Sequence, residues 1–388
     1  MTLHKNVNSK CKIKRIVVNE SRQQSPFPEF EDNLNSQNMS AAMTAISKWP
    51  AYTKTPLVSL ENVADHCGVE RVLYKDESKR FGLKSFKALG GAYAVFNLVS
   101  QQSKKGVRPS ELTVTTATDG NHGRSVAWGA QLSGCNAEIY IHEKVSQQRA
   151  DAMAFYGAKI NRVKGNYEAS LAACKKDAIA KQRFIVSDTS WEGYRKEPLD
   201  IMAGYTVMGQ EILESMGETR PTHCFLPIGV GGLAAGVVAP IWRDMGKNLG
   251  SMIGVESYMS DCFLQSINSG APQLVDVKEE TMMAGLSCGE ISDLAWEVLK
   301  PSLSHCVSIT DDAIAPLMFA FANGNFSEEK IEAGECATSG LNALLAAKED
   351  KKIWHSLGIK SDSVVLLLGT EGATDPYIYS EMLDQGRL

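Results

Sequence analysis

The chain has 388 residues, of which 44% are hydrophobic and 22% charged, a composition typical of a globular protein with enough length for two domains. Its net charge of -5 at pH 7 argues against a nucleic-acid partner. No apolar run approaches the roughly 20 residues that a membrane-spanning helix needs, so no membrane partner is expected.

Residues 1–45 are predicted to form a polar N-terminal arm, either solvated or at the edge of a dimer. The basic stretch KCKIKR (10–15) is not followed by the apolar core of a secretory signal. Nine cysteines occur without a CxxC pair, which fits a reducing, cytoplasmic compartment, although the sequence leaves open whether Cys262 and Cys288 pair. The seven histidines include no HExxH pattern, so no metal site is expected.

Runs of apolar and β-branched residues predict strands, which alternate with helical patterns. The predicted strands are 72–78, 112–118, 137–143, 159–165, 223–232, 251–257 and 362–372. One predicted helix begins at about Ser85 and another after 119–123. A third is predicted over 150–158. This alternation is typical of an α/β protein with parallel sheets. No linker rich in Pro, Gly or Ser divides the chain, so a two-domain arrangement would place one domain inside the other.

Three loops each follow a predicted strand, at the edge of the sheet where α/β folds bind ligands. The first, GVGGLAAG (229–236), opens a helix, so its backbone N–H groups could converge on a phosphate. A close-packed turn is the equally good alternative. The Gly-Lys-Ser/Thr of a nucleotide-binding P-loop is absent, and a dinucleotide fingerprint fits poorly because no acidic residue follows at a suitable distance.

The other two loops carry polar side chains. In TATDGNHGRS (116–125), Asp119, Gly120 and Asn121 stand at a predicted helix start. Helix capping explains Asp and Asn there, and a site for a substrate carboxylate is the functional alternative. In GTEGATD (369–375), Thr370 is the first polar side chain after an apolar strand, and an ordinary turn hydroxyl is the alternative reading.

Lys87 stands in an unusual context, FGLKSFKALGG (81–91). Burial and the positive end of a helix both lower the pKa of a lysine, and a neutral amine is a nucleophile for carbonyl groups. A surface lysine whose charge reaches solvent is the alternative. A Schiff-base lysine together with a phosphate loop points to pyridoxal 5'-phosphate (PLP) as cofactor.

From Thr55 to Pro376 the chain resembles the tryptophan-synthase-β family of PLP enzymes, also called fold type II. The resemblance lies in TPLVSL (55–60), the Lys87 region, the Asp-Gly-Asn-His-Gly loop, the glycine loop and the last strand. Within this family the chain most resembles the diaminopropionate ammonia-lyases, through the segments 75–91, 116–128, 187–194, 282–290 and 369–376.

The resemblance implies a fold of two open, mostly parallel-sheet domains, with the smaller inserted in the larger. We expect 46–87 and 197–388 to form the large PLP-binding domain and 88–196 the smaller one. A homodimer acting on a small amino acid is expected.

The resemblance also implies roles for single residues. Lys87 would form the Schiff base with PLP. The residues that would hold its phosphate are Gly229, Val230, Gly231, Gly232 and Leu233. Asn121 would bind the ring oxygen, and Thr370 would face the pyridine nitrogen. A hydroxyl at that nitrogen leaves it largely unprotonated, which favours expulsion of a β-substituent.

Asp119 bears on the choice of substrate, because this chain has an aspartate where related hydroxyamino-acid dehydratases carry a small residue. Its carboxylate would suit a second ammonium group on the substrate, with Gly120 and Asn121 as further substrate contacts. Asp119 and Asp188 could also act as acid or base, although a turn acceptor is an equal alternative for Asp188.

The expected reaction is α,β-elimination of 2,3-diaminopropionate to pyruvate and ammonia. A serine/threonine-type dehydratase or another amino-acid β-lyase is the first alternative, and a non-catalytic PLP-binding protein is a remote one.

Overall fold

The computed structural model describes residues 5–28 and 33–387, which divide into two compact units. Unit 1 contains the described residues of Met1–Glu29, Lys54–Lys79 and Met208–Leu388, and unit 2 contains those of Phe30–Thr53 and Arg80–Val207. The predicted domains have other boundaries and stay a prediction. Residues 1–4 and 29–32 of the predicted arm lie outside the described residues.

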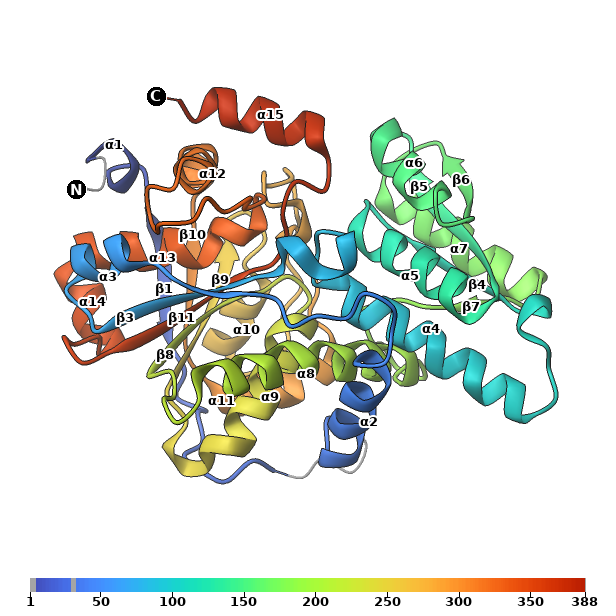
Figure 1. Cartoon of the computed structure of the whole chain (residues 1–388), viewed down its shortest axis with the longest axis horizontal. Helices are drawn as coiled ribbons and strands as arrows, with labels where there is room; N and C mark the ends of the chain where they lie inside the picture. Colours follow the sequence, from blue (N-terminus) through green and yellow to red (C-terminus); the bar gives the residue numbers. More distant parts are fainter. Residues whose placement is uncertain (1–4, 29–32, 388) are drawn as a thin grey trace. The chain divides into compact units, whose positions relative to one another are not determined.

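Unit 1 is built on a seven-stranded sheet with the order β1-β10-β9-β8-β11-β3-β2 (Figure 1). Its strands are β1 (Ile13–Val18), β2 (Leu57–Ser59), β3 (Arg71–Asp76), β8 (His223–Pro227), β9 (Ser251–Ser257), β10 (Leu303–Ile309) and β11 (Val364–Gly369). The two edge strands, β1 and β2, pair antiparallel to their neighbours, and the five inner strands are parallel. The inner strands are almost continuous apolar runs, as expected when both faces of a sheet are covered.

Helices cover this sheet, and α13 packs against β8, β9, β10 and β11. The helices of unit 1 are α1 (Lys5–Asn8), α3 (Glu61–Cys67), α9 (Gly232–Met245), α10 (Cys262–Ser269), α11 (Asp293–Ser302), α12 (Ile314–Ala322), α13 (Ser339–Glu349), α14 (Lys351–Leu357) and α15 (Pro376–Gln385). Because β8 and β11 are parallel neighbours, the loops that follow them leave the same edge of the sheet.

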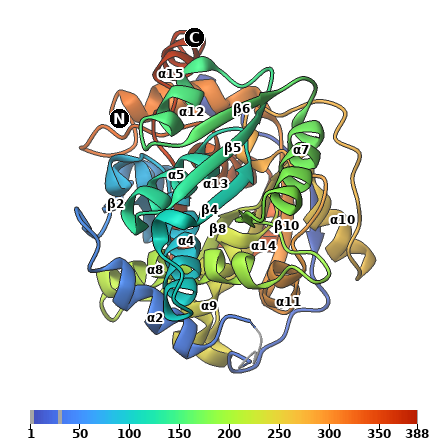
Figure 2. The same cartoon turned by 90° about the vertical axis from the view of Figure 1, so that its right-hand side faces the viewer.

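Unit 2 contains a four-stranded parallel sheet with the order β6-β5-β4-β7. Its strands are β4 (Thr113–Ala117), β5 (Asn136–His142), β6 (Lys159–Val163) and β7 (Phe184–Ile185). Its helices are α2 (Ser36–Ile46), α4 (Lys87–Lys104), α5 (Asn121–Ser133), α6 (Gln147–Ala154) and α7 (Tyr167–Ala180), and α8 (Lys196–Met216) begins in this unit. Figure 2 shows β4, β5 and β6 with α7 beside them. Since β4 lies between β5 and β7, three strand ends meet at one edge.

The predicted fold class is confirmed, because the protein is α/β with mostly parallel sheets. Each predicted strand overlaps an observed one, and 251–257 coincides with β9. Helix α6 ends earlier than predicted, before Gly157, which adopts a positive φ of 84°. Within the described residues, no helix is long and apolar enough to cross a membrane.

Candidate active site

Lys87 is the first residue of α4, and its side chain is 20% exposed. Its ammonium Nζ forms an ion pair with the carboxylate of Asp188 and lies 5.5 Å from the centre of the Phe86 ring. The lysine therefore reaches a specific partner inside unit 2, which argues against the alternative of a snorkelling surface side chain.

The glycine pair after Lys87 brings helices close together and so fixes the start of α4. A Cβ atom on Gly90 would lie 2.5 Å from the ring of Tyr205, and one on Gly91 would lie 2.5 Å from Ser125 Oγ. The Ser125 hydroxyl donates a hydrogen bond to the Lys87 carbonyl at 2.5 Å and accepts one from the Ala92 N–H at 3.0 Å. Larger residues in place of the glycines would push α5 and α8 away from the helix that carries the lysine.

Asp188 follows β7 and faces both Lys87 and His122. Burial acts to raise the pKa of Asp188, but the charges of the Lys87 ammonium and the His122 imidazole outweigh it and hold this pKa well below its usual range. Burial lowers the pKa of His122, whose Nε2 bonds the Val186 carbonyl at 2.8 Å and whose Nδ1 lies 3.9 Å from Asp188 Oδ2. Asp188 is therefore an ionised carboxylate in contact with the lysine, as a proton-handling role requires.

The loop that carries Asp188 is pinned by Tyr194. The Tyr194 hydroxyl accepts a hydrogen bond from the Ser187 N–H and donates one to the Ile185 carbonyl, both at 2.9 Å. Its ring stacks on Trp191 with the centroids 4.1 Å apart. These contacts fix the backbone next to Asp188.

Asp119 lies between β4 and α5, and helix capping does not account for it. The N-cap residue is Gly120, which supplies no side-chain cap. The Thr118 hydroxyl instead accepts hydrogen bonds from the Gly120 and Gly123 N–H groups, at 3.0 and 3.1 Å. Asp119 Oδ1 lies 3.0 Å from His142 Nε2 at the end of β5, and the side chain of Asp119 is 46% exposed. Its carboxylate is therefore accessible to a solute.

Asn121 is the first residue of α5 and is half-buried. Its side chain forms no hydrogen bond to another described residue, so the amide is available to a ligand. Gly120 lies directly before it, with the Arg149 side chain 3.3 Å from the position that a Cβ atom on Gly120 would occupy.

The glycine loop of unit 1 connects β8 to α9 and has the form of an anion cradle. Gly231 is the N-cap of α9 with a φ of 96°, a conformation that favours glycine. A Cβ atom on Gly229 would lie 2.6 Å from the Gly285 carbonyl oxygen. No N–H group of residues 229–233 donates a hydrogen bond within the described part of the chain. These amides, at the N-terminus of a 14-residue helix, therefore fit a phosphate group.

Thr370 directly follows β11, the strand that is paired with β8. It is 1% exposed, and its hydroxyl has no hydrogen-bond partner among the described residues. The next residue, Glu371, accepts a hydrogen bond from the Cys336 N–H at 2.9 Å. Burial, with the charge of Glu335, raises the pKa of Glu371 to about 7. The buried, unpaired hydroxyl of Thr370 fits a ring nitrogen of a cofactor.

Several buried polar atoms of the described part of unit 2 have no hydrogen-bond partner, and the Tyr205 hydroxyl and His122 Nδ1 are among them. The Tyr205 ring packs on Phe86, next to Lys87, with the centroids 4.9 Å apart. Unpaired polar atoms are rare in protein interiors, and their position beside Lys87 fits a polar ligand there.

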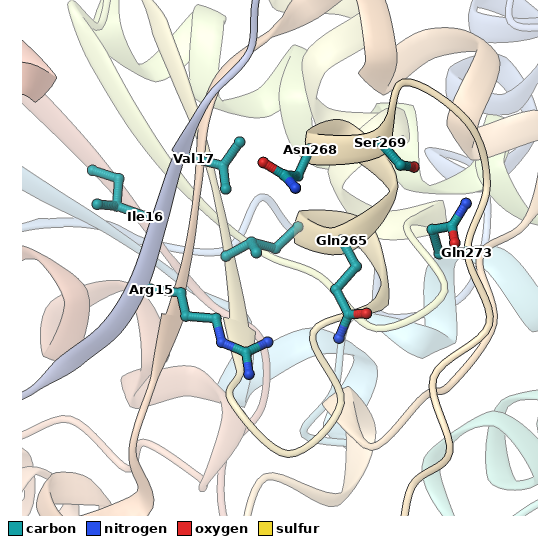
Figure 3. Close-up of a pocket in the computed structure, with 8 residues that line it drawn as sticks. Arg15, Ile16, Val17, Gln265, Asn268, Ser269 and Gln273 are labelled. Carbon is teal, nitrogen blue, oxygen red and sulfur yellow. The ribbon is translucent and has the colours of Figure 1, made fainter.

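A surface hollow in unit 1 contains none of the predicted site residues (Figure 3). In Figure 3, Arg15 and Val17 of β1 face Gln265 and Asn268 of α10 across the hollow. The Arg15 guanidinium forms an ion pair with Asp261 at 3.0 Å.

Within residues 5–28 and 33–387, no cluster of three or more His, Cys, Asp or Glu side chains could hold a metal ion. The nine cysteines, Cys262 and Cys288 included, are free thiols.

Residues 48–369 match the model of a family described as pyridoxal-phosphate-dependent enzymes. The chain belongs to this family, and PLP is its cofactor, as the lysine, the glycine loop and the unpaired hydroxyl of Thr370 indicate.

Among curated relatives, the chain is 37% identical over 357 residues to the diaminopropionate ammonia-lyase of Escherichia coli (strain K12), which covers 88% of this chain and 89% of that enzyme. It is 26% identical over 281 residues to the biosynthetic L-threonine dehydratase of the same strain, covering 71% of this chain and 50% of that enzyme.

A crystal structure of the E. coli diaminopropionate ammonia-lyase, in complex with an aminoacrylate–PLP azomethine reaction intermediate, matches with a TM-score of 0.88 and 34% identity. The match covers 97% of this chain and 98% of that chain.

Sequence reasoning missed His122, His142 and Tyr205. His122 stands inside the Asp-Gly-Asn-His-Gly motif, and His142 lies next to the end of the predicted strand 137–143, so their place near strand ends could have identified them. Tyr205 carries no such signal, because a tyrosine within a long helix is read as core.

Proposed function

We propose that this chain catalyses the α,β-elimination of ammonia from 2,3-diaminopropionate and yields pyruvate and a second ammonia. The observation that carries the proposal is the set of ionisable side chains at the ends of β4 and β7, in a chain that is 37% identical to a diaminopropionate ammonia-lyase. Hydroxyamino acids, the substrates of the dehydratases, have no second ammonium group that Asp119 could bind.

Bound PLP supplies an electron sink that stabilises negative charge on the substrate Cα. In the proposal, the amides of residues 229–233 hold its phosphate, Asn121 binds its ring oxygen and Thr370 faces its ring nitrogen. Neither the amides nor the hydroxyl carries a charge, so they orient the ring without protonating its nitrogen.

Lys87 and Asp188 handle the proton at Cα. The ion pair between them keeps a carboxylate and an amine next to each other, so a proton removed from the substrate has an acceptor within reach. The low pKa of Asp188 keeps the carboxylate ionised while Lys87 is charged, and loss of that charge makes the carboxylate a stronger base. Tyr194 keeps the Asp188 loop in place through Ser187.

Asp119 binds the β-ammonium group of the substrate and manages the proton that decides whether ammonia can leave. An unpaired ammonium is costly to bury, and the Asp119 side chain, which is 46% exposed, offers a carboxylate to pair with it. Gly120 and Asn121 complete this substrate loop. We further propose a cytoplasmic homodimer, supported by the free thiols and by the family resemblance.

The test is the stoichiometry of products from the purified PLP-loaded protein. Diaminopropionate consumes one water and gives two ammonia per pyruvate, whereas serine gives one ammonia per pyruvate. We expect turnover of diaminopropionate at a ratio of two, with a higher kcat/KM than for serine or threonine. Preference for serine or threonine would establish the dehydratase alternative, and PLP absorbance without turnover of any of the three would establish a non-catalytic PLP-binding protein.

A further inference from the structure

His142 is placed beside Asp119 by the pairing of two neighbouring strands. In the parallel pair of β4 and β5, Ala117 lies opposite Tyr140. Asp119 follows Ala117 by two residues, just after β4 ends, and His142 follows Tyr140 by two residues at the end of β5, so the two side chains leave the sheet at the same edge. The distance from His142 Nε2 to Asp119 Oδ1 is 3.0 Å.

The hydrogen bonds of the His142 ring define its tautomer. The backbone N–H of Lys144 donates to His142 Nδ1 at 3.3 Å, so Nδ1 is an acceptor and carries no proton. A neutral imidazole with this acceptor carries its proton on Nε2, the nitrogen that faces Asp119 Oδ1 at 3.0 Å, although the two groups are not aligned as a hydrogen bond. Because the imidazole side chain is only 9% exposed, its surroundings restrict the ring to this orientation.

We propose that His142 is a positioning residue that selects diamino substrates by holding the Asp119 carboxylate in place. The inference rests on the proposed function, in which Asp119 binds the second ammonium group. Contact with the Nε2 edge of the imidazole restricts where the Asp119 carboxylate can lie, and an N–H group on that edge favours the charged form of the carboxylate. The carboxylate remains accessible, since the Asp119 side chain is 46% exposed.

The position of His142 has a consequence for specificity. A loosely held carboxylate pays conformational entropy when it binds an ammonium group, and a preorganised one does not. Diaminopropionate gains from this preorganisation, whereas serine, which lacks a second ammonium group, does not. Loss of His142 should therefore change the ratio of the two kcat/KM values more than it changes the activity on serine.

The test compares His142→Ala with His142→Gln, whose side-chain amide places an N–H donor near the position of Nε2. For His142→Ala we expect kcat/KM on diaminopropionate to fall about tenfold or more, mainly through KM, relative to serine. The Gln variant should regain most of that loss. His355→Ala, an exposed histidine on α14, is the matched control and should change neither activity.

Two further measurements separate positioning from structural support. In an Asp119→Asn background, His142→Ala should have no additional effect on the substrate ratio, because the group that it positions has lost its charge. In 15N-histidine-labelled wild-type protein without substrate, the chemical shifts of His142 should show the Nε2–H tautomer.

Equal losses of His142→Ala on both substrates, additive effects in the double variant, or an Nδ1–H tautomer would each overturn the inference. Failure of the wild-type protein to turn over diaminopropionate would instead reject the proposed function, and the tautomer would still decide whether His142 turns an Nε2–H group toward Asp119.

Discussion

The two groups of candidate site residues differ in how they use charge. In unit 2, the ends of β4, β5 and β7 carry ionisable side chains, among them Asp119, His142 and Asp188, and Lys87 opens α4. In unit 1, the ends of β8 and β11 lead to a glycine loop and Thr370, which offer backbone amides and a hydroxyl.

This difference separates two tasks that PLP enzymes combine. Backbone amides and a hydroxyl can hold a cofactor in a fixed orientation, because their dipoles do not change with proton transfer. Ionisable side chains can move protons, because each has two protonation states. Side-chain substitutions should therefore affect turnover in unit 2, and backbone or burial changes should affect binding and stability in unit 1.

The largest effect is expected for Lys87→Ala, which should abolish steady turnover while PLP still binds through the glycine loop. Borohydride reduction of the PLP-loaded wild-type protein, followed by peptide mapping, should place the cofactor on Lys87. Lys104→Ala, at the other end of the same helix and exposed, is the matched control and should retain full activity. A label on another lysine, or residual turnover in Lys87→Ala near that of the control, would reject the assignment.

A smaller effect is expected for Gly231→Val in unit 1. The positive φ of Gly231 disfavours a β-branched residue, and a Cβ atom would lie 2.8 Å from Ala295 and Phe263 side-chain atoms. We expect the Kd for PLP to rise at least about tenfold, or ~1.4 kcal/mol, in a PLP titration followed by absorbance.

Gly246→Ala is the control for backbone strain alone, because Gly246 also has a positive φ, ends the same helix and has no atom within 4 Å of a Cβ position. An unchanged Kd in a Gly231→Val protein with native circular dichroism would argue against this loop as the phosphate site.

The smallest effect concerns Glu371. Burial raises its pKa from 4.5 to about 7, so between these values the folded protein binds more protons than the unfolded chain. The stabilising contribution is therefore full below pH 4.5 and is lost as the pH rises through 7. Glu371→Gln keeps the acceptor for the Cys336 N–H but does not titrate. From pH 5 to pH 8 the Tm of the wild type should fall relative to the variant by about 2–6 °C. Parallel Tm curves would show that Glu371 does not titrate in this range.

The sequence predicted β3, β4, β5, β6, β8, β9 and β11, and it missed β1, β2, β7 and β10. β9 and β11 are buried runs whose composition identifies them. β10 was missed because its apolar residues are interrupted by Ser304, His305 and Ser308, and β1 because it is the charged edge strand IKRIVV. Such strands form because neighbouring strands supply hydrogen-bond partners for their backbone. A local sequence pattern does not show which strands are neighbours.

The same limit applies to the site. Lys87 and the glycine loop could be predicted because each is defined by adjacent residues. The contacts of Asp188 with Lys87 and of Asp119 with His142 join residues 101 and 23 positions apart. They depend on the strand order β5-β4-β7, which local sequence does not reveal.

The central claim is that the carboxylate of Asp119 selects a substrate with a second ammonium group. The most direct test measures kcat/KM of the wild type and of Asp119→Asn on diaminopropionate, serine and threonine. The variant keeps the size and a hydrogen-bonding group but loses the charge, which is worth roughly 1.5–3 kcal/mol, or about ten- to a hundredfold. We predict a loss of that size on diaminopropionate and a small loss on the other two substrates. Equal losses on the three substrates would contradict the claim, because Asp119 would then only shape its loop.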